Sequence, residues 1–97
     1  MHTDRYRLAL LDYLTGTDDE RSLVYAYEFG RKRIHHRAGL LQIVRVHQKA
    51  LRSILQAAPA DKRLHFLLSS EQFLMEALSS FEMTSRGYVA LVHRPPS

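Results

Sequence analysis

The last third of the chain carries the most informative hydrophobic pattern. Residues 64–92 contain no proline and one glycine, and their apolar residues recur at helical spacing. At about 100° per residue they spread over roughly 220°, whereas a surface helix of a monomer usually has an apolar stripe of about 100° or a little more. Such a helix is covered by a larger core or by another chain, and a length of 97 residues favours the second. The arc consists of Leu64, Phe66, Leu67, Leu68, Phe73, Leu74, Met75, Ala77, Leu78 and Phe81.

Three further helices are predicted upstream. Gly16 and the pair Ala38-Gly39 interrupt the pattern, and Pro59 ends a segment because the residue before a proline avoids helical geometry. The acidic run at residues 17–20 suits the positive end of a helix dipole. No segment alternates with a period of two, so strands are not expected. The predicted helices are residues 4–14, 17–37, 40–57 and 61–92.

The short connections between these helices imply antiparallel neighbours, and hence an all-α, four-helix up-and-down bundle. A helix over residues 61–92 would be about 48 Å long, against roughly 18 to 30 Å for the others. Either this helix breaks near Ser79-Ser80, or a second copy of the chain covers its overhang. We favour a homodimer formed through the long helix. Residues 1–93 are expected to form one domain, and residues 94–97 a tail or the start of a linker.

Composition narrows the chemistry and the location. The chain has no cysteine, which excludes disulfides, thiolate zinc sites and cysteine nucleophiles. No apolar run approaches 18 residues, and the N-terminal sequence lacks the hydrophobic region of a signal peptide. We therefore expect a cytoplasmic domain without a membrane partner.

The net charge of +4 is distributed unevenly. Residues 21–63 hold ten Lys and Arg residues against two acids, whereas residues 1–20 carry a charge of −3 and residues 64–97 a charge of −1. A basic block of this kind fits an acidic protein surface or nucleic acid, although in small helical domains it is more often a solvated face. The basic residues do not share one helical face and no recognition motif accompanies them, so nucleic acid is not the favoured partner. A nucleic-acid-binding domain, as an alternative, would use Arg31, Lys32, Arg33, Arg37, Arg45, Lys49 and Arg52.

No arrangement of side chains indicates catalysis, a metal site or a cofactor. The chain has no HExxH motif, no converging carboxylates and no glycine-rich phosphate loop. His47 lies on the apolar stripe of the third predicted helix, where a histidine is usually buried and hydrogen-bonded. Its alternative role is a phosphoacceptor in a histidine phosphotransfer module, which requires His47 or His36 to be exposed. We expect a protein that is not an enzyme.

Two helices carry apolar residues where polar ones are expected. Val24 lies among charged residues of the second predicted helix, on the side that should face solvent. Met75, Ser79 and Met83 follow one another at intervals of four along the margin of the apolar arc. Methionine adapts to the shape of a partner, so these residues are either part of a docking surface or the edge of the core.

Three stretches together resemble the N-terminal regulatory domain of RsbU-type stress-response phosphatases. They are residues 26–32 (AYEFGRK), 42–51 (QIVRVHQKAL) and 73–83 (FLMEALSSFEM), which occur in the order and at the spacing of that family. The resemblance implies a four-helix domain that dimerises and has no activity of its own. It also implies a fold related to the C-terminal domain of the circadian clock protein KaiA.

In that family the domain is a docking platform. A GHKL-type switch protein kinase binds the dimer and activates a linked PP2C-type phosphatase, which turns on a stress sigma factor through partner switching. The partner surface draws on the start of the second helix and on the fourth helix, and the matching positions here are Val24, Met75 and Ser79. Ser79 departs from the family, which can place an aliphatic residue there. The chain also ends without a phosphatase domain, as an excised domain or a free-standing adaptor would.

These observations predict two sets of binding residues. Partner recognition would use Val24, Met75, Ser79 and Met83, with Arg31 and Lys32 tuning association through their charge. Dimerisation would bury part of the long helix, with four anchors: Leu67, Leu74, Leu78 and Phe81.

Overall fold

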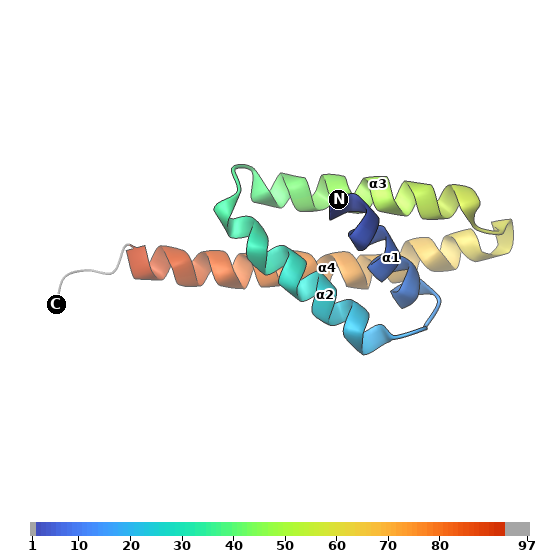
Figure 1. Ribbon diagram of the computed structural model, residues 1–97, viewed down its shortest axis with the longest axis horizontal. Coiled ribbons are helices and arrows are strands. Elements are labelled where there is room, and N and C mark those ends of the chain that lie inside the picture. The colour runs from blue at the N-terminus through green and yellow to red at the C-terminus, as the bar shows by residue number, and fades with distance from the viewer. Residues whose placement is uncertain (1, 93–97) are drawn as a thin grey trace.

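The computed structural model describes the backbone of residues 2–92 and the side chains of residues 4–87 (Figure 1). The described chain is helical and contains no strand, which confirms the all-α prediction. The elements in order are α1 (His2–Leu14), α2 (Asp19–Lys32), the short 3-10 helix η1 (Arg33–His35), α3 (Gly39–Ala57) and α4 (Ala60–Val92).

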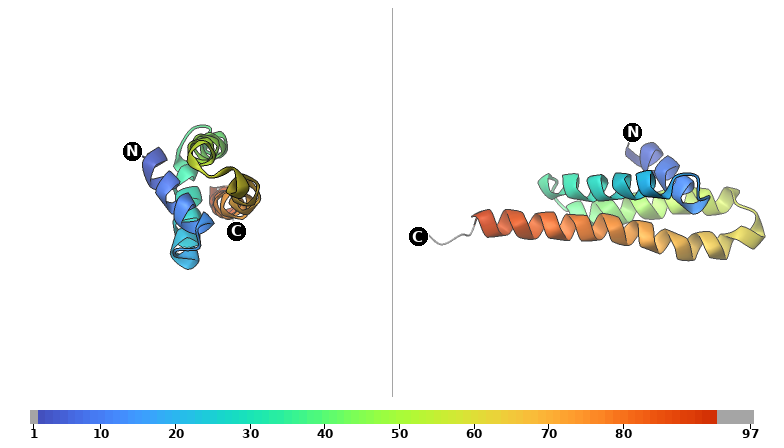
Figure 2. Two further views of the ribbon diagram at one scale, coloured as in Figure 1. Left: turned by 90° about the vertical axis from the view of Figure 1, so that its right-hand side faces the viewer. Right: turned by 90° about the horizontal axis from the view of Figure 1, so that it is seen from below.

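The four helices pack side by side into an elongated body of 59 × 24 × 21 Å. The chain reverses direction at each connection, and α1 crosses the others obliquely (Figures 1 and 2). The closest packing partners are α2 with α4 and α1 with α3. In Figure 1 the C-terminal end of α4 runs on past the α2–α3 connection, so the expected overhang is present.

Local sequence signals set most of the helix ends. Gly16 adopts a positive φ of 71° after α1, a conformation that glycine reaches without strain. The Asp18 carboxylate accepts a hydrogen bond of 3.1 Å from the backbone N–H of Arg21, which caps α2. Ala38, in the left-handed region at φ 57°, precedes the first turn of α3.

The predicted end of the second helix at residue 37 is wrong. Helix α2 ends at Lys32, and residues 33–35 continue as a 3-10 turn in which the N–H of Arg33 bonds to the carbonyl of Gly30. The tighter turn places the Arg33 side chain against the ring of Phe29, where it is buried. Phe29 lies four residues earlier on α2, so this contact is local to the end of the helix.

Tyr6 is the centre of the core and joins all four helices. Its ring is fully buried and meets Phe29 of α2 at 5.0 Å, His47 of α3 at 5.7 Å and Phe73 of α4 at 5.1 Å between ring centroids. These are edge-to-face contacts, the arrangement that aromatic quadrupoles favour. The surrounding core is Leu10, Leu14, Ala26, Ile43, Ala50, Ile54 and Ala77.

Helix α4 is continuous over 33 residues and therefore about 50 Å long. The alternative of a break near Ser79-Ser80 is wrong, since both residues lie within the helix. The Ser80 hydroxyl donates a hydrogen bond to the carbonyl of Ala77, so the serine pair is satisfied inside the helix. Over residues 2–92, no helix has the length and apolar character needed to cross a bilayer.

Candidate protein-docking surface

Exposed apolar side chains are concentrated on α4. Of the nine large hydrophobic residues that are exposed among those described, five belong to this helix. Most of them come from the broad apolar arc of the sequence, so the bundle covers only part of that arc. The five are Leu64, Leu67, Leu68, Met75 and Met83.

Four residues lie on one side of α4, which we call the outer stripe: Leu64, Leu68, Met75 and Ser79. At about 100° per residue they fall within roughly 60° of one another on the helix surface. Leu64, Leu68 and Met75 are 67%, 57% and 52% exposed. Ser79 is also exposed and lies toward the C-terminal end of the stripe. Leu64 and Leu68 were not among the predicted site residues, although the same helical spacing identifies them.

The outer stripe points away from the rest of the bundle. A Cβ atom placed on Gly30 of α2 would overlap with the backbone oxygen of Ala77 and the hydroxyl of Ser80. These two residues therefore mark the side of α4 that faces α2. They lie roughly 160° around the helix from the centre of the stripe, on its opposite side.

The remaining predicted partner residues are exposed, but only Met83 adjoins this stripe. Met83 lies at its edge, roughly 100° from Leu64 around α4. Val24, Arg31 and Lys32 lie on the exposed side of α2, and the Arg31 guanidinium donates a 2.7 Å hydrogen bond to Glu28. Because α2 packs on the opposite side of α4, a partner that contacts both sets would have to span two sides of the bundle.

The four predicted dimer anchors lie on a second strip of α4, centred roughly 100° from the outer stripe. Leu74, Leu78 and Phe81 are half-buried against the core, whereas Leu67 is exposed. Leu78 and Phe81 also line a shallow pocket with Leu40 of α3, which is itself exposed. The side shared by α3 and α4 therefore retains accessible apolar surface.

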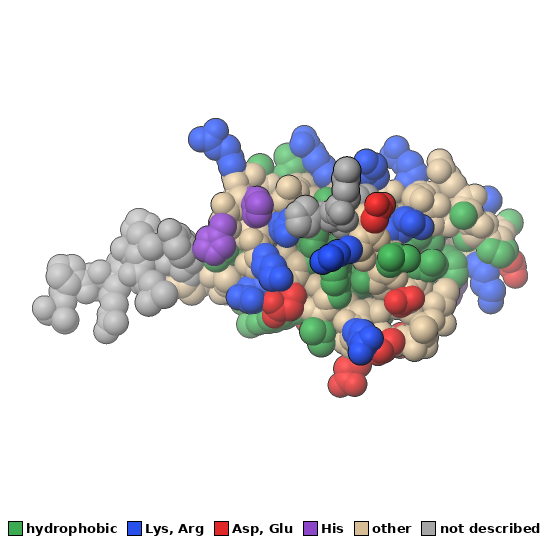
Figure 3. All heavy atoms as spheres, viewed as in Figure 1, with side chains coloured by type: hydrophobic (Ala, Val, Ile, Leu, Met, Phe, Trp, Pro, Cys, Tyr) green, Lys and Arg blue, Asp and Glu red, His purple; other side chains and the backbone are tan. Residues whose placement is uncertain are grey.

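The basic residues do not form one exposed patch. Figure 3 shows Lys and Arg side chains distributed over several helices of the face in view. Arg33, one of the seven residues of the nucleic-acid alternative, is buried with its Cζ 4.4 Å from the centroid of the Phe29 ring. The other six are exposed and divided between α2, the connection that follows it and α3.

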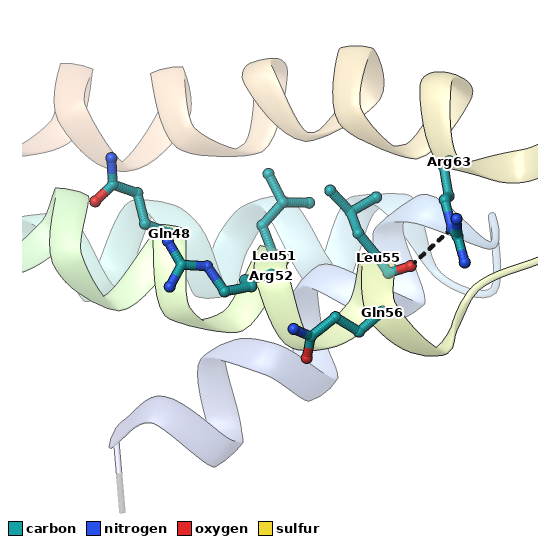
Figure 4. Close-up of a pocket in the computed structure, with 6 residues that line it drawn as sticks. All are labelled: Gln48, Leu51, Arg52, Leu55, Gln56 and Arg63. Carbon is teal, nitrogen blue, oxygen red and sulfur yellow. Dashed lines mark hydrogen bonds between the residues drawn. The ribbon is translucent and has the colours of Figure 1, made fainter. Parts of the chain in front are cut away.

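A hollow on the surface lies between the C-terminal half of α3 and the start of α4 (Figure 4). It has a volume of about 610 Å³ and an apolar floor formed by Leu51 and Leu55. The Arg63 guanidinium donates a 3.1 Å hydrogen bond from Nε to the carbonyl of Leu55, which ties the two helices together. The remaining residues that line this hollow form a polar rim without a carboxylate: Gln48, Arg52 and Gln56.

His47 is buried, as predicted, and is hydrogen-bonded to Tyr6. The Tyr6 hydroxyl lies 2.6 Å from His47 Nδ1, with both residues inside the core. Burial lowers the pKa of His47 to about 4 and raises the pKa of Tyr6. Both groups are therefore neutral near pH 7, and a phenol that donates to Nδ1 leaves the imidazole proton on Nε2. The alternative in which His47 is an exposed phosphoacceptor is wrong, because His47 is buried. His36, the other histidine of that alternative, is exposed in the connection between η1 and α3.

Acidification is expected to destabilise the domain through His47. Its imidazole binds a proton near pH 6.5 in the unfolded chain but only near pH 4 in the folded one. The stabilisation by the neutral histidine is complete above about pH 6.5 and is lost as the pH falls toward 4, by up to ~1.4 kcal/mol per pH unit. Urea denaturation across this range measures the effect. His47→Gln removes the titrating group and should weaken the pH dependence of the free energy of unfolding. An equally steep loss of stability on acidification in this variant would contradict the role of His47.

Comparison with models of known protein families identifies the family of this chain. The family model described as the N-terminal domain of the phosphoserine phosphatase RsbU matches residues 4–84. The chain belongs to this family. The match runs from α1 into the second half of α4 and includes all three stretches on which the resemblance was based. Comparisons with curated proteins and with solved structures found no match.

The family membership indicates which kind of domain this chain forms. The family model describes the N-terminal domain of this phosphatase and not its catalytic PP2C domain. An N-terminal domain of this family fits a regulatory role in a partner-switching pathway, which implies protein partners. The likeness in fold to the C-terminal domain of KaiA stays a prediction.

Proposed function

We propose that this chain is a non-catalytic, homodimeric regulatory domain that docks a GHKL-type switch protein kinase in a cytoplasmic stress-signalling pathway. The observation that carries the proposal is the outer stripe of α4, where Leu64, Leu68 and Met75 are more than half exposed. In a family whose N-terminal domain is regulatory, an uncovered apolar strip on the longest helix is the natural contact for a second protein.

The outer stripe is suited to binding in its chemistry. Complete burial of a leucine or methionine side chain contributes roughly 1.5–3 kcal/mol, so three half-exposed side chains supply a useful part of a docking energy. Met75 can adapt its unbranched side chain to a partner surface. The cationic residues Arg31 and Lys32 on α2 would accelerate association with an acidic partner without adding much affinity.

The second strip of α4 supports the homodimer. Leu67 is exposed in the single chain, while Leu74, Leu78 and Phe81 are only half covered by α3 and the core. A second copy packed on this side would cover the remaining apolar surface as well as Leu40 of α3.

Leu67→Asp is expected to convert the dimer to a monomer, because it places a charge among the apolar side chains of the interface. Size-exclusion chromatography with light scattering should give twice the chain mass for the wild type and a single mass for the variant. Leu8→Asp provides the matched control, since Leu8 is equally an exposed leucine but lies on α1. A wild-type chain that is monomeric at micromolar concentration would contradict the dimer.

Affinity capture tests the docking role. The wild-type chain, Met75→Asp and Leu41→Asp are used as baits in a lysate of the source organism, and the captured proteins are identified by mass spectrometry. A GHKL-type kinase should be enriched by the wild type and by Leu41→Asp, which alters an exposed leucine of α3, but not by Met75→Asp. Circular dichroism and dimer mass verify that each bait is folded. Equal recovery of the kinase by all three baits would exclude the outer stripe as the docking surface.

A further inference from the structure

Arg33 is a buried cation without an anionic partner. Only 4% of the residue is exposed, and its guanidinium stacks on the ring of Phe29. The buried Nε atom donates no hydrogen bond, and no carboxylate of residues 4–87 forms an ion pair with this side chain. Burial lowers the pKa of Arg33, yet a guanidinium remains charged at neutral pH. Buried polar groups are normally paired, so the Arg33 side chain retains an unused buried donor at Nε.

A small pocket connects Arg33 with two further cations. The pocket has a volume of about 150 Å³ and lies between α1 and the C-terminal half of α2. Arg5 enters from α1 and Lys32 from α2, while Tyr25 and Phe29 supply aromatic walls. In Figure 3, Lys and Arg side chains gather around an acidic one over this part of α2.

The acid that lines this pocket is already engaged. Glu28 accepts the 2.7 Å hydrogen bond from Arg31, and this bond is the main cause of the lowered pKa of its carboxyl group. The field inside the pocket is therefore positive. The pKa of Tyr25 is consistent with this positive field. Burial raises this pKa, and the positive charges of Arg33 and Arg5 both act to lower it.

We propose that the pocket formed by Arg5, Tyr25, Lys32 and Arg33 binds a phosphate group, either as free phosphate or as part of a small phosphomonoester. A guanidinium presents a planar fork of donors that matches phosphate oxygens, and the lysine ammonium adds a mobile positive charge. The Tyr25 hydroxyl is available as a further donor. A bound phosphate would also supply the partner that the buried Arg33 lacks.

Size and charge favour phosphate over a carboxylate. The volume equals that of about five water molecules, enough for a tetrahedral oxyanion. A phosphate carrying a charge of about −1.5 to −2 at neutral pH matches a pocket lined by three cationic residues better than a monovalent carboxylate does. This site lies between α1 and α2, so the inference does not depend on the outer stripe of α4.

Thermal denaturation and titration calorimetry of the full chain test the proposal. The added salts are sodium phosphate, glycerol phosphate, sodium acetate and sodium chloride at equal ionic strength. Phosphate should raise the melting temperature in a saturable manner beyond the effect of chloride, because a ligand that binds only the folded state stabilises it. The variants Arg5→Gln and Lys32→Gln change exposed side chains and should weaken phosphate binding at least tenfold.

Two further variants distinguish a built site from general charge effects. Arg33→Met should abolish phosphate binding, and it should not lower stability in chloride because it removes an uncompensated buried charge. Arg45→Gln removes the same charge from the exposed side of α3 and should leave phosphate binding unchanged. Should Arg33→Met fail to fold, the two exposed-site variants alone carry the test.

The salts also identify the source of the phosphate. Binding of inorganic phosphate alone supports a site for the free ion, and tighter binding of glycerol phosphate supports a phosphorylated small molecule. The proposal is overturned if phosphate stabilises the chain no more than chloride does, or if acetate binds as well as phosphate. It is equally overturned if Arg45→Gln weakens binding as much as Arg5→Gln.

Discussion

Gly30→Leu is expected to unfold the domain. At Gly30 the backbones of α2 and α4 approach so closely that even one added Cβ atom would meet the Ala77 carbonyl and the Ser80 hydroxyl. The Ala77 carbonyl belongs to the backbone of α4 and cannot rotate away, so the two helices must separate. Overpacking a core typically costs about 1–3 kcal/mol for small additions, and a leucine adds four carbon atoms at the contact. For a domain whose total stability is about 5–15 kcal/mol, that loss is decisive.

Gly30→Ala tests the same helix contact with the smallest possible side chain. Alanine is favoured over glycine in a helix by about 1 kcal/mol, yet the overlap should reverse the sign and lower the stability by roughly 1–3 kcal/mol. Gly87→Ala is the matched control, since it lies in α4 with nothing within 4 Å of its added Cβ, and should raise the stability. Urea denaturation followed by circular dichroism measures both. A stabilising Gly30→Ala would contradict the close approach of α2 and α4.

Tyr6→Ala is expected to remove about 3–5 kcal/mol from the free energy of unfolding, the range for loss of a large buried aromatic side chain. The effect should be large because the ring of Tyr6 packs against three other helices at once. Tyr6→Phe keeps the ring and removes only the partner of His47 Nδ1, which leaves a buried ring nitrogen unpaired at a cost of about 1–3 kcal/mol.

Tyr27→Phe is the control for the hydroxyl. Tyr27 is half-buried on α2, and within residues 4–87 its hydroxyl forms no hydrogen bond, so its removal should change the stability by less than about 0.5 kcal/mol. Chemical denaturation at about pH 7, where His47 is neutral, gives all three values. If Tyr6→Phe were as harmless as Tyr27→Phe, the buried hydrogen bond would contribute nothing.

The sequence was sufficient where a structural feature depends on neighbouring residues. Gly16, Asp18 and Pro59 mark helix ends through their own backbone and capping chemistry, and the structure places the breaks there. The sequence also predicted a helix after residue 60 but left a break near Ser79-Ser80 open, and the structure shows one continuous helix. The end of α2 was not predicted, because neither proline nor glycine marks the change from α-helical to 3-10 geometry after Lys32.

Features that depend on several helices could not be read from the pattern of any one of them. Tyr6 lies in a mostly polar stretch, and its central position becomes clear only when α2, α3 and α4 surround it. The exposure of Val24 was predicted from its helical angle, whereas Met75 was placed at the margin of the apolar arc, and both are exposed. Their placement on different sides of the bundle follows from the packing of α2 against α4 at Gly30, which a single helix does not reveal.

The docking proposal is tested most directly by calorimetric titration of the full chain with a purified GHKL-type switch kinase from the same organism. We expect saturable binding by the wild type and by Leu41→Asp, and at least a hundredfold loss of affinity for Leu68→Asp and Met75→Asp. All four proteins should retain the same helicity and the same mass. Unchanged affinity in both stripe variants, or no binding by the wild type, would contradict the assignment of the outer stripe as the docking surface.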